Sequence, residues 1–314
     1  MKTSAIVVFV GDPYLALTFY KSYKKFWDEE VDEIVVGISS KRDDMLDFIG
    51  EIWGKEPKAR VLKIKNQYGY GSPDHGQTLD ALAAMAKHEI LMTIDSDFFI
   101  LRKGVINEFK KKMNFHHVMG STAGRICGEN DLKLKFIKQA KYGRVCPWLS
   151  FWNMDMLRDL KFPTMQSVFV KRKGDIFEMC PLDGNQDRAA ESEELWLETM
   201  GWLTYKVFTE KNNVSFEEIP SKSKSYFHMI GVSMGVRKYM KDMKTNLVFD
   251  RDHQSGFHSC SFLPSIYYNY MKNLKDYKNS DYYESILDLI ERNKTTEEKL
   301  KEDKSNIHLD CIFS

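Results

Sequence analysis

Short apolar runs rich in β-branched residues alternate with helical patterns through the first third of the chain, and this alternation restricts the fold more than any other feature. The predicted strands are residues 5–10, 31–39, 59–65 and 89–95, and the predicted helices between them are residues 14–27, 42–54 and 77–88. Apolar runs of this length indicate strands that are buried on both faces of a parallel sheet. The pattern therefore predicts βαβ units in a Rossmann-like, mostly parallel α/β sheet with helices on both faces.

The alternation fades after residue 100. We expect a helix at 104–113, a strand at 116–123, a strand, turn and helix within 147–160, an acidic helix at 187–201 and a strand at 202–209. From residue 263 the chain is rich in lysine and aromatic residues and has a helical pattern, which predicts a C-terminal helical extension with a polar tail.

Composition places the chain among ordinary globular proteins. Of its 314 residues, 43% are apolar and 29% charged, and the formal net charge of +1 gives no whole-chain attraction to a polyanion. The five cysteines show no CxxC spacing, which argues against a cysteine zinc site or a disulfide framework and fits a reducing compartment. The N-terminal apolar run is too short for a signal peptide, and no run is long enough to span a membrane, so we expect a cytoplasmic protein.

Asp95 and Asp97 lie between two apolar runs, Ile90–Ile94 and Phe98–Leu101. A cap on a following helix would explain one carboxylate, but two unpaired charges beside buried strands would cost several kcal/mol. Residues i and i+2 of a strand share a face, so both carboxylates can converge just beyond the strand end. Mg²⁺ or Mn²⁺ prefers such oxygen ligands, and ligands of parallel sheets bind at this edge. The tripeptide therefore predicts a divalent metal site.

Around this motif the sequence resembles the GT-A fold nucleotide-sugar glycosyltransferases, in their family-2-like form. The opening strand "AIVVFVGD", the helix "LTFYKSYKKF", the strand "VDEIVVGIS" and the segment "GSPDHGQTLDALAAMAKHEILMTIDSD" follow in the order and lengths of that family. The resemblance is close over residues 4–105 and loose over 140–235. It implies a catalytic domain at 1–262, with a nucleotide-sugar-binding half at 1–105 and an acceptor half at 106–262, followed by the extension at 263–314.

The same resemblance implies the activity and the donor side of the site. The protein would be a metal-dependent glycosyltransferase that moves a sugar, with inversion, from a nucleotide-diphosphate sugar, a UDP-sugar being favoured, to an unidentified acceptor. Asp95 and Asp97 would bind Mn²⁺ or Mg²⁺ together with the diphosphate, Asp97 as the direct ligand. The residues expected to contact the nucleotide sugar are Val10, Gly11, Asp12, Ser39, His75, Gln77, Asp95 and Ser96. The family often has Arg or Lys where this chain has Asp74–Gln77.

A downstream histidine often completes the metal site in that family, and His228 in "SKSYFHMIGVS" is the best candidate, ahead of His253 and His258. An inverting enzyme also needs a carboxylate base on the acceptor side. The family places it at the start of a helix that a Gly-aromatic pair closes. Counting back from Gly201-Trp202 favours Asp187, with Asp183 and Glu191 behind it.

Trp148 and Trp152 are candidate acceptor platforms, although core packing would explain both equally well. The basic stretches 133–144 and 171–173 keep a modified DNA base open as acceptor, but a solvated charged face is the preferred interpretation. A nucleotidyltransferase would usually carry a glycine-rich loop with a basic residue after the first strand, where this chain has "GDPYLALTFY". A non-catalytic nucleotide-sugar-binding module is the remaining alternative, and the intact Asp95-Ser96-Asp97 argues against it.

Overall fold

The structure is a computed structural model that describes residues 1–9, 13–40, 43–65, 72–100, 102–123, 143–174, 176–181, 193–220, 223 and 225–228. The expected C-terminal extension at 263–314 lies outside these residues, and the proposed division at residues 105 and 262 stays a prediction. No helix in the described ranges is long and apolar enough to cross a membrane.

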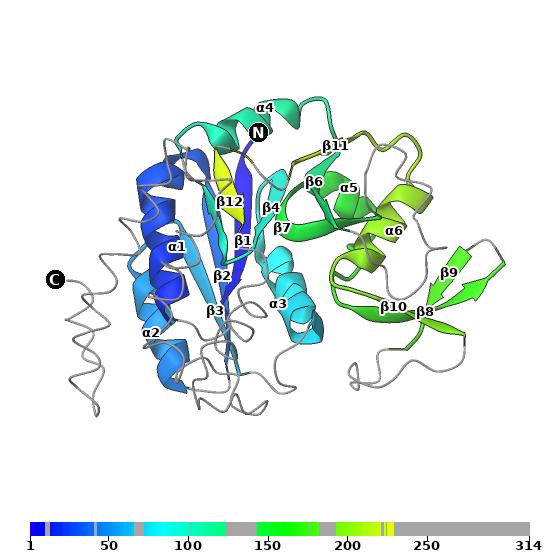
Figure 1. Ribbon diagram of the computed structural model, residues 1–314, viewed down its shortest axis with the longest axis horizontal. Coiled ribbons are helices and arrows are strands. Elements are labelled where there is room, and N and C mark those ends of the chain that lie inside the picture. Colours follow the sequence, from blue (N-terminus) through cyan, green and yellow to red (C-terminus); the bar gives the residue numbers. More distant parts are fainter. Residues whose placement is uncertain are drawn as a thin grey trace, which may run out of the picture.

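A seven-stranded sheet forms the centre of the molecule (Figure 1). Its strands, in spatial order, are β11 (Phe216–Glu218), β6 (Val118–Ala123), β7 (Arg144–Asn153), β4 (Ile90–Ile94), β1 (Thr3–Phe9), β2 (Glu33–Ser40) and β3 (Ala59–Lys65). The strands β4, β1, β2 and β3 are parallel, which confirms the four predicted strands and the α/β class. β7 runs antiparallel to both β4 and β6, and β11 is parallel to β6. The sheet is therefore mixed, with its parallel half at the N-terminus of the chain.

Helices cover both faces of the parallel half. α1 (Pro13–Phe26) and α2 (Asp43–Gly54) lie on one face and α3 (Ser72–Met85) on the other (Figure 1). The side chains of β1 alternate between the two layers: Val7 belongs to the core under α1 and α2, and Ile6 and Val8 to the core under α3. Both faces of the strand are buried, as its continuous apolar run predicts.

Two small sheets and three helices complete the described structure. A three-stranded antiparallel sheet has the order β10 (Glu194–Leu197), β8 (Val168–Lys173), β9 (Ile176–Met179). A two-stranded ribbon pairs β5 (Phe98–Ile100) with β12 (Tyr226–His228). The remaining helices are α4 (Val105–Lys112), α5 (Met154–Asp159) and α6 (Gly201–Glu210), with a 3₁₀ turn at Asp28–Glu30.

The predictions for residues 187–209 are wrong wherever the structure describes them. Glu194–Leu197 is a strand paired with β8 rather than the end of a helix, and Gly201–Glu210 is a helix rather than a strand. The aromatic and β-branched residues of α6 favour a strand locally, but tertiary packing overrides that preference. Trp202 and Tyr205, three residues apart, stack at 5.3 Å on one side of the helix. Leu203 and Val207, four apart, pack into the core that α3 also covers.

The helix α3 begins at Ser72, five residues before the predicted start at Gln77. Pro73 is compatible with this start, because a proline in the first turn of a helix loses no intrahelical hydrogen bond. The consequence for the site is direct, because His75 and Gly76 belong to the first turn of a helix instead of a loop.

Candidate active site

Asp95, Ser96 and Asp97 form a tight turn where β4 ends. The backbone N–H of Asp95 donates to the carbonyl of Trp148 in β7, and the N–H of Phe98 donates back to the carbonyl of Asp95 at 3.0 Å. All four parallel strands end at this edge of the sheet, so the turn lies where ligands of parallel α/β sheets bind.

His228 joins the two aspartates although it lies far along the chain. β12 pairs with β5 so that His228 is opposite Phe98, directly after the turn. One ligand atom each of Asp95, Asp97 and His228 lies within 4.8 Å of the others, and His228 Nε2 is 3.3 Å from Asp97 Oδ1. The structure thus brings together the three residues that the sequence suggested as metal ligands.

The imidazole of His228 is held by its aromatic neighbours. Its side chain is 3% exposed and lies against the rings of Trp148 and Phe98, with centroid distances of 4.5 and 5.7 Å. Its Nδ1 finds no hydrogen-bond partner within the part of the chain that the structure describes. These tilted ring contacts restrict the imidazole, whose Nε2 faces the carboxylate of Asp97.

A second imidazole reaches the site from the other side. His75, in the first turn of α3, places Nε2 3.5 Å from Asp95 Oδ1. Burial raises the pKa of Asp95, the charge of Asp97 raises it further, and His75 and His228 act in the opposite direction. The net upward shift means that a full negative charge on Asp95 is disfavoured until a cation compensates it.

The chemistry of these side chains fits a divalent metal. Carboxylate oxygens are ligands that Mg²⁺ and Mn²⁺ prefer, and the imidazole nitrogen of His228 adds affinity for transition metals such as Mn²⁺. Three protein ligands leave further coordination positions for other oxygens. The arrangement suits a site that shares its metal with a phosphate-containing ligand.

The other predicted residues are distributed unevenly. Ser39 is buried near the end of β2, Gln77 is exposed on α3, and Ser96 is half-buried in the turn. Trp148 is half-buried, and its ring packs against the imidazole of His228. Several predicted residues lie outside the described ranges: Val10, Gly11, Asp12, Asp183, Asp187, Glu191, His253 and His258.

The assignment of Trp152 as an acceptor platform is wrong. Its side chain is fully buried in the core on the α3 face of the sheet, and its indole N–H donates to Ser150 Oγ at 2.6 Å. A ring without an exposed face cannot stack on a sugar, so Trp152 is a core residue.

Arg144 and Glu198 form a charged pair that the sequence analysis did not expect. Arg144, at the start of β7, is buried, donates to the carbonyl of Thr199 and pairs with the carboxylate of Glu198. Its charge acts to lower the pKa of Asp95, against the net upward shift that burial causes. Glu198 precedes α6 by three residues and remains 39% exposed. A correct prediction of the start of α6 would have drawn attention to it.

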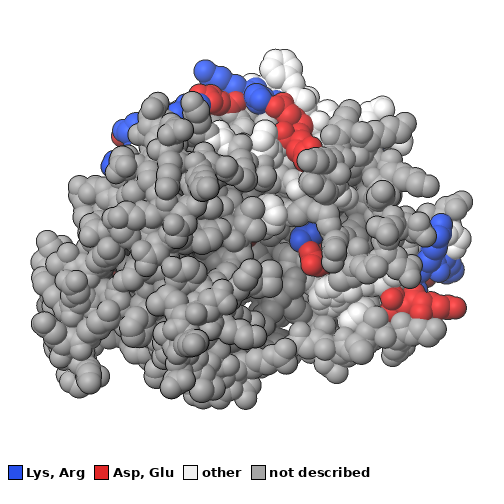
Figure 2. All heavy atoms as spheres, in the orientation of Figure 1, with Lys and Arg blue, Asp and Glu red and all other residues white. Residues whose placement is uncertain are grey.

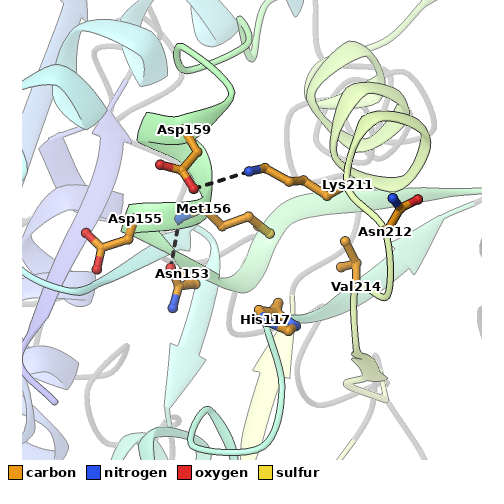
Figure 3. A pocket seen from close by; sticks show the side chains of 8 residues that line it. All are labelled: His117, Asn153, Asp155, Met156, Asp159, Lys211, Asn212 and Val214. Atoms are coloured by element: carbon orange, nitrogen blue, oxygen red, sulfur yellow. Dashed lines mark hydrogen bonds and ion pairs between the residues drawn. The ribbon is translucent and has the colours of Figure 1, made fainter.

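A separate pocket of about 290 Å³ lies at the opposite edge of the sheet (Figure 3). It includes Asn153, which is paired with Ile90 at the start of β4, whereas the aspartates follow the end of that strand. Asn153 caps α5, and an ion pair of 3.2 Å joins Lys211 to Asp159 across the rim. Its position excludes it from the site around Asp95.

No protein-family model matches this sequence, and no curated protein sequence matches it significantly. Among solved structures, S. aureus TarS 1–349 in complex with UDP-GlcNAc is 12% identical, with a TM-score of 0.43 and coverage of 98% of this chain and 93% of that one. A longer TarS structure is 15% identical, with a TM-score of 0.43, and the match spans 88% of this chain but only 44% of that one. Glucosyl-3-phosphoglycerate synthase from Mycobacterium tuberculosis, in complex with Mn²⁺, UDP-glucose and phosphoglyceric acid, is 16% identical over 52% of this chain and 60% of that one, with a TM-score of 0.39.

Proposed function

We propose that this protein is a metal-dependent, inverting glycosyltransferase that takes a sugar from a nucleotide-diphosphate sugar, with a UDP-sugar as the favoured donor. The observation that carries the proposal is the cluster of Asp95, Asp97 and His228 at the carboxyl end of β4. The mixed sheet around it has the architecture that the sequence resemblance to GT-A glycosyltransferases implies.

On the donor side, Asp95, Asp97 and His228 would hold Mn²⁺ or Mg²⁺. When bound, the metal supplies positive charge that stabilises the diphosphate leaving group. His75 lies beside Asp95 at the N-terminal turn of α3, where backbone N–H groups favour anions. These residues orient the diphosphate, and His75 takes the place at which the family often has Arg or Lys.

On the acceptor side, Glu198 is the proposed base, because its carboxylate is 39% exposed and is held by the buried Arg144. It would accept the proton of the acceptor hydroxyl while that oxygen bonds to the anomeric carbon and the bond to the diphosphate oxygen breaks. The ion pair with the buried Arg144 fixes the direction of the carboxylate. Asp187, Asp183 and Glu191 remain predictions. The count that favoured Asp187 took Gly201-Trp202 as the end of a helix, and that pair begins α6 instead.

The charges that the structure describes in β8 do not favour a nucleic-acid acceptor, and residues 133–142 of the other basic stretch lie outside the described ranges. In the basic stretch of β8, Lys171 lies 3.6 Å from Glu194, and Lys173 lies 3.0 Å from Glu178. Figure 2 shows blue and red side chains together along the upper and right-hand edges of this face, so neither edge carries a single sign of charge. A phosphate backbone needs a continuous positive track.

The direct test is a donor-hydrolysis screen with UDP-, GDP- and other nucleotide sugars in the presence of Mn²⁺, together with calorimetric titration of each donor. We expect a UDP-sugar to bind only with metal and to be hydrolysed slowly, with water as acceptor. Asp97→Ala should abolish both signals, whereas Asp155→Ala, an exposed aspartate at the opposite edge, should leave them unchanged. Hydrolysis that persists in Asp97→Ala would refute the proposal, and metal-dependent binding without turnover would favour a binding module.

A further inference from the structure

The short segment Thr164–Gln166, between α5 and β8, contacts both the donor side and the acceptor side of the site. One neighbour is the first half of α3, which carries His75, and the other is the turn that leads from β10 into α6 and follows Glu198.

The contact with α3 is made backbone to backbone. A Cβ atom added at Gly76 would lie 2.5 Å from the Cα of Gln166 and 2.9 Å from the carbonyl oxygen of Met165. One turn later, the carboxylate of Asp80 accepts hydrogen bonds from the N–H of Met165 at 2.6 Å, from Gln166 Nε2 at 3.2 Å and from the hydroxyl of Thr164. The segment therefore lies directly on the helix surface and is tied to it by three hydrogen bonds.

The contact with the β10–α6 turn is made through Met165. The carbonyl oxygen of Met165 accepts a hydrogen bond of 2.7 Å from the N–H of Met200. Met200 is fully buried and has φ of 65°, a left-handed conformation that costs a non-glycine residue on the order of 1 kcal/mol or more. Arg144 donates to the neighbouring carbonyl of Thr199, so the strained turn is held from two directions. Glu198 directly precedes Thr199 in the chain.

We propose that Thr164–Gln166 is a shared support that sets the position of His75 relative to Glu198, and that Gly76 and Asp80 are positioning residues for sugar transfer. The inference rests on the proposed function, because His75 and Glu198 act on the donor and acceptor sides of the reaction there. Gly76 allows the backbone of Thr164–Gln166 to approach α3 closely, and the hydrogen bonds of Asp80 fix the position of this segment along the helix.

The expected effect follows from the distances. Ordinary contact with a Cβ begins near 3.4 Å, so an alanine at position 76 must move either α3 or the support by about 0.9 Å, the difference between 3.4 and 2.5 Å. A misplacement of about 1 Å in a catalytic site can lower the rate by about 100-fold. Asp95 and Asp97, in the turn after β4, and His228, in β12, lie outside α3 and the support, so we expect this cluster to keep its position.

The test compares Gly76→Ala with Gly54→Ala, a matched control at the end of α2 where an added Cβ meets no atom within 4 Å. Each variant is assayed for UDP-sugar hydrolysis, for Mn²⁺ affinity without nucleotide and for Tm. We expect kcat of Gly76→Ala to fall by about 100-fold while its Mn²⁺ affinity stays within about twofold of wild type. Gly54→Ala should match the wild type in all three measurements.

Asp80→Asn provides a second variant that keeps the side-chain shape, in case Gly76→Ala does not fold. Its amide places an NH₂ group against donors that now face a carboxylate oxygen, so kcat should fall with little change in KM for the donor. An active wild type whose kcat is unchanged in both folded variants would overturn this inference alone. A wild type that neither binds nor hydrolyses any nucleotide sugar would overturn the proposed function and this inference with it.

Discussion

Replacing Asp95 by asparagine should make the metal-free protein more stable and at the same time remove its response to Mn²⁺. Asp95 is half-buried, its carboxylate lies within 4.8 Å of a ligand atom of Asp97, and burial and that neighbouring charge both raise its pKa. Ionised Asp95 is thus a destabilising group in the absence of a cation. The amide in Asp95→Asn removes the charge with almost no change in volume.

The magnitude follows from Coulomb's law. Two unit charges 4.8 Å apart, the upper limit of the separation, repel by about 3 kcal/mol at an effective dielectric constant of about 20. His75 and His228 offset part of this repulsion, so a gain of about 1–3 kcal/mol is expected in the metal-free protein. For domains of a few hundred residues, 1 kcal/mol shifts Tm by about 2–4 °C, so the Tm in EDTA should rise by several degrees.

The pH dependence has a defined sign. Because the pKa of Asp95 is higher in the folded than in the unfolded state, the folded metal-free protein binds the extra proton. The stability that this proton contributes to the folded state is therefore fully present below the ordinary carboxyl pKa of about 3.9. It is lost as pH rises through the raised pKa that Asp95 has in the folded state. The difference in Tm between Asp95→Asn and wild type should grow over that range.

The assay is thermal unfolding in EDTA and in Mn²⁺, across pH, with Asp155→Asn as the control because Asp155 is 78% exposed and far from the cluster. Wild type and control should gain Tm on addition of Mn²⁺, since a ligand that binds the folded state stabilises it, and Asp95→Asn should not. A variant that is less stable than wild type in EDTA, or that gains as much from Mn²⁺, would show that the electrostatic reasoning is wrong.

Three further substitutions test the fold that carries the site. Burial raises the pKa of Glu33, but its hydrogen bonds, one of them from Arg60, lower that pKa by more, so the net shift is downward. Glu33→Gln should therefore cost about 1.5–3 kcal/mol at pH 7. In denaturant titrations the difference in free energy of unfolding between wild type and Glu33→Gln should shrink as pH falls below about 4. A difference that stays constant with pH would contradict the ionic contribution of Glu33. Trp152→Ala should cost about 3–5 kcal/mol in the same titrations as a core deletion, and a specific loss of acceptor binding at unchanged stability would restore its role as a platform. Gly37→Ala should cost about 1–3 kcal/mol by overpacking, because its Cβ would lie 2.6 Å from Thr78 Cγ2, and an unchanged free energy of unfolding would show that α3 yields there.

The parallel half of the sheet could be predicted because the hydrophobic pattern of each element there indicates which of its faces are buried. The runs that became β1 and β4 are apolar on both faces, and the intervening helices show their apolar residues at helical spacing. The convergence of Asp95 and Asp97 also follows from local geometry, since alternate residues of a strand share a face.

Local pattern was misleading where packing between distant segments decides the structure. Residues 202–209 have strand propensity, yet the stacking of Trp202 on Tyr205 and the burial of Leu203 and Val207 select a helix. That error led the count from Gly201-Trp202 to Asp187 and away from Glu198, the residue we propose as the base. Trp152 was ambiguous because an aromatic residue in a strand has the same pattern whether it faces a ligand or the core.

The sequence by itself determined that the chain builds a parallel α/β sheet with two carboxylates at the carboxyl end of a buried strand, because hydrophobic periodicity and strand geometry are local properties. Only the tertiary structure decided that His228 reaches those carboxylates through the β5–β12 ribbon, and that Arg144 pairs with Glu198. It also decided that one short segment supports both sides of the site. These contacts join residues far apart in the chain, so they depend on how whole elements pack and not on the propensity of any one of them.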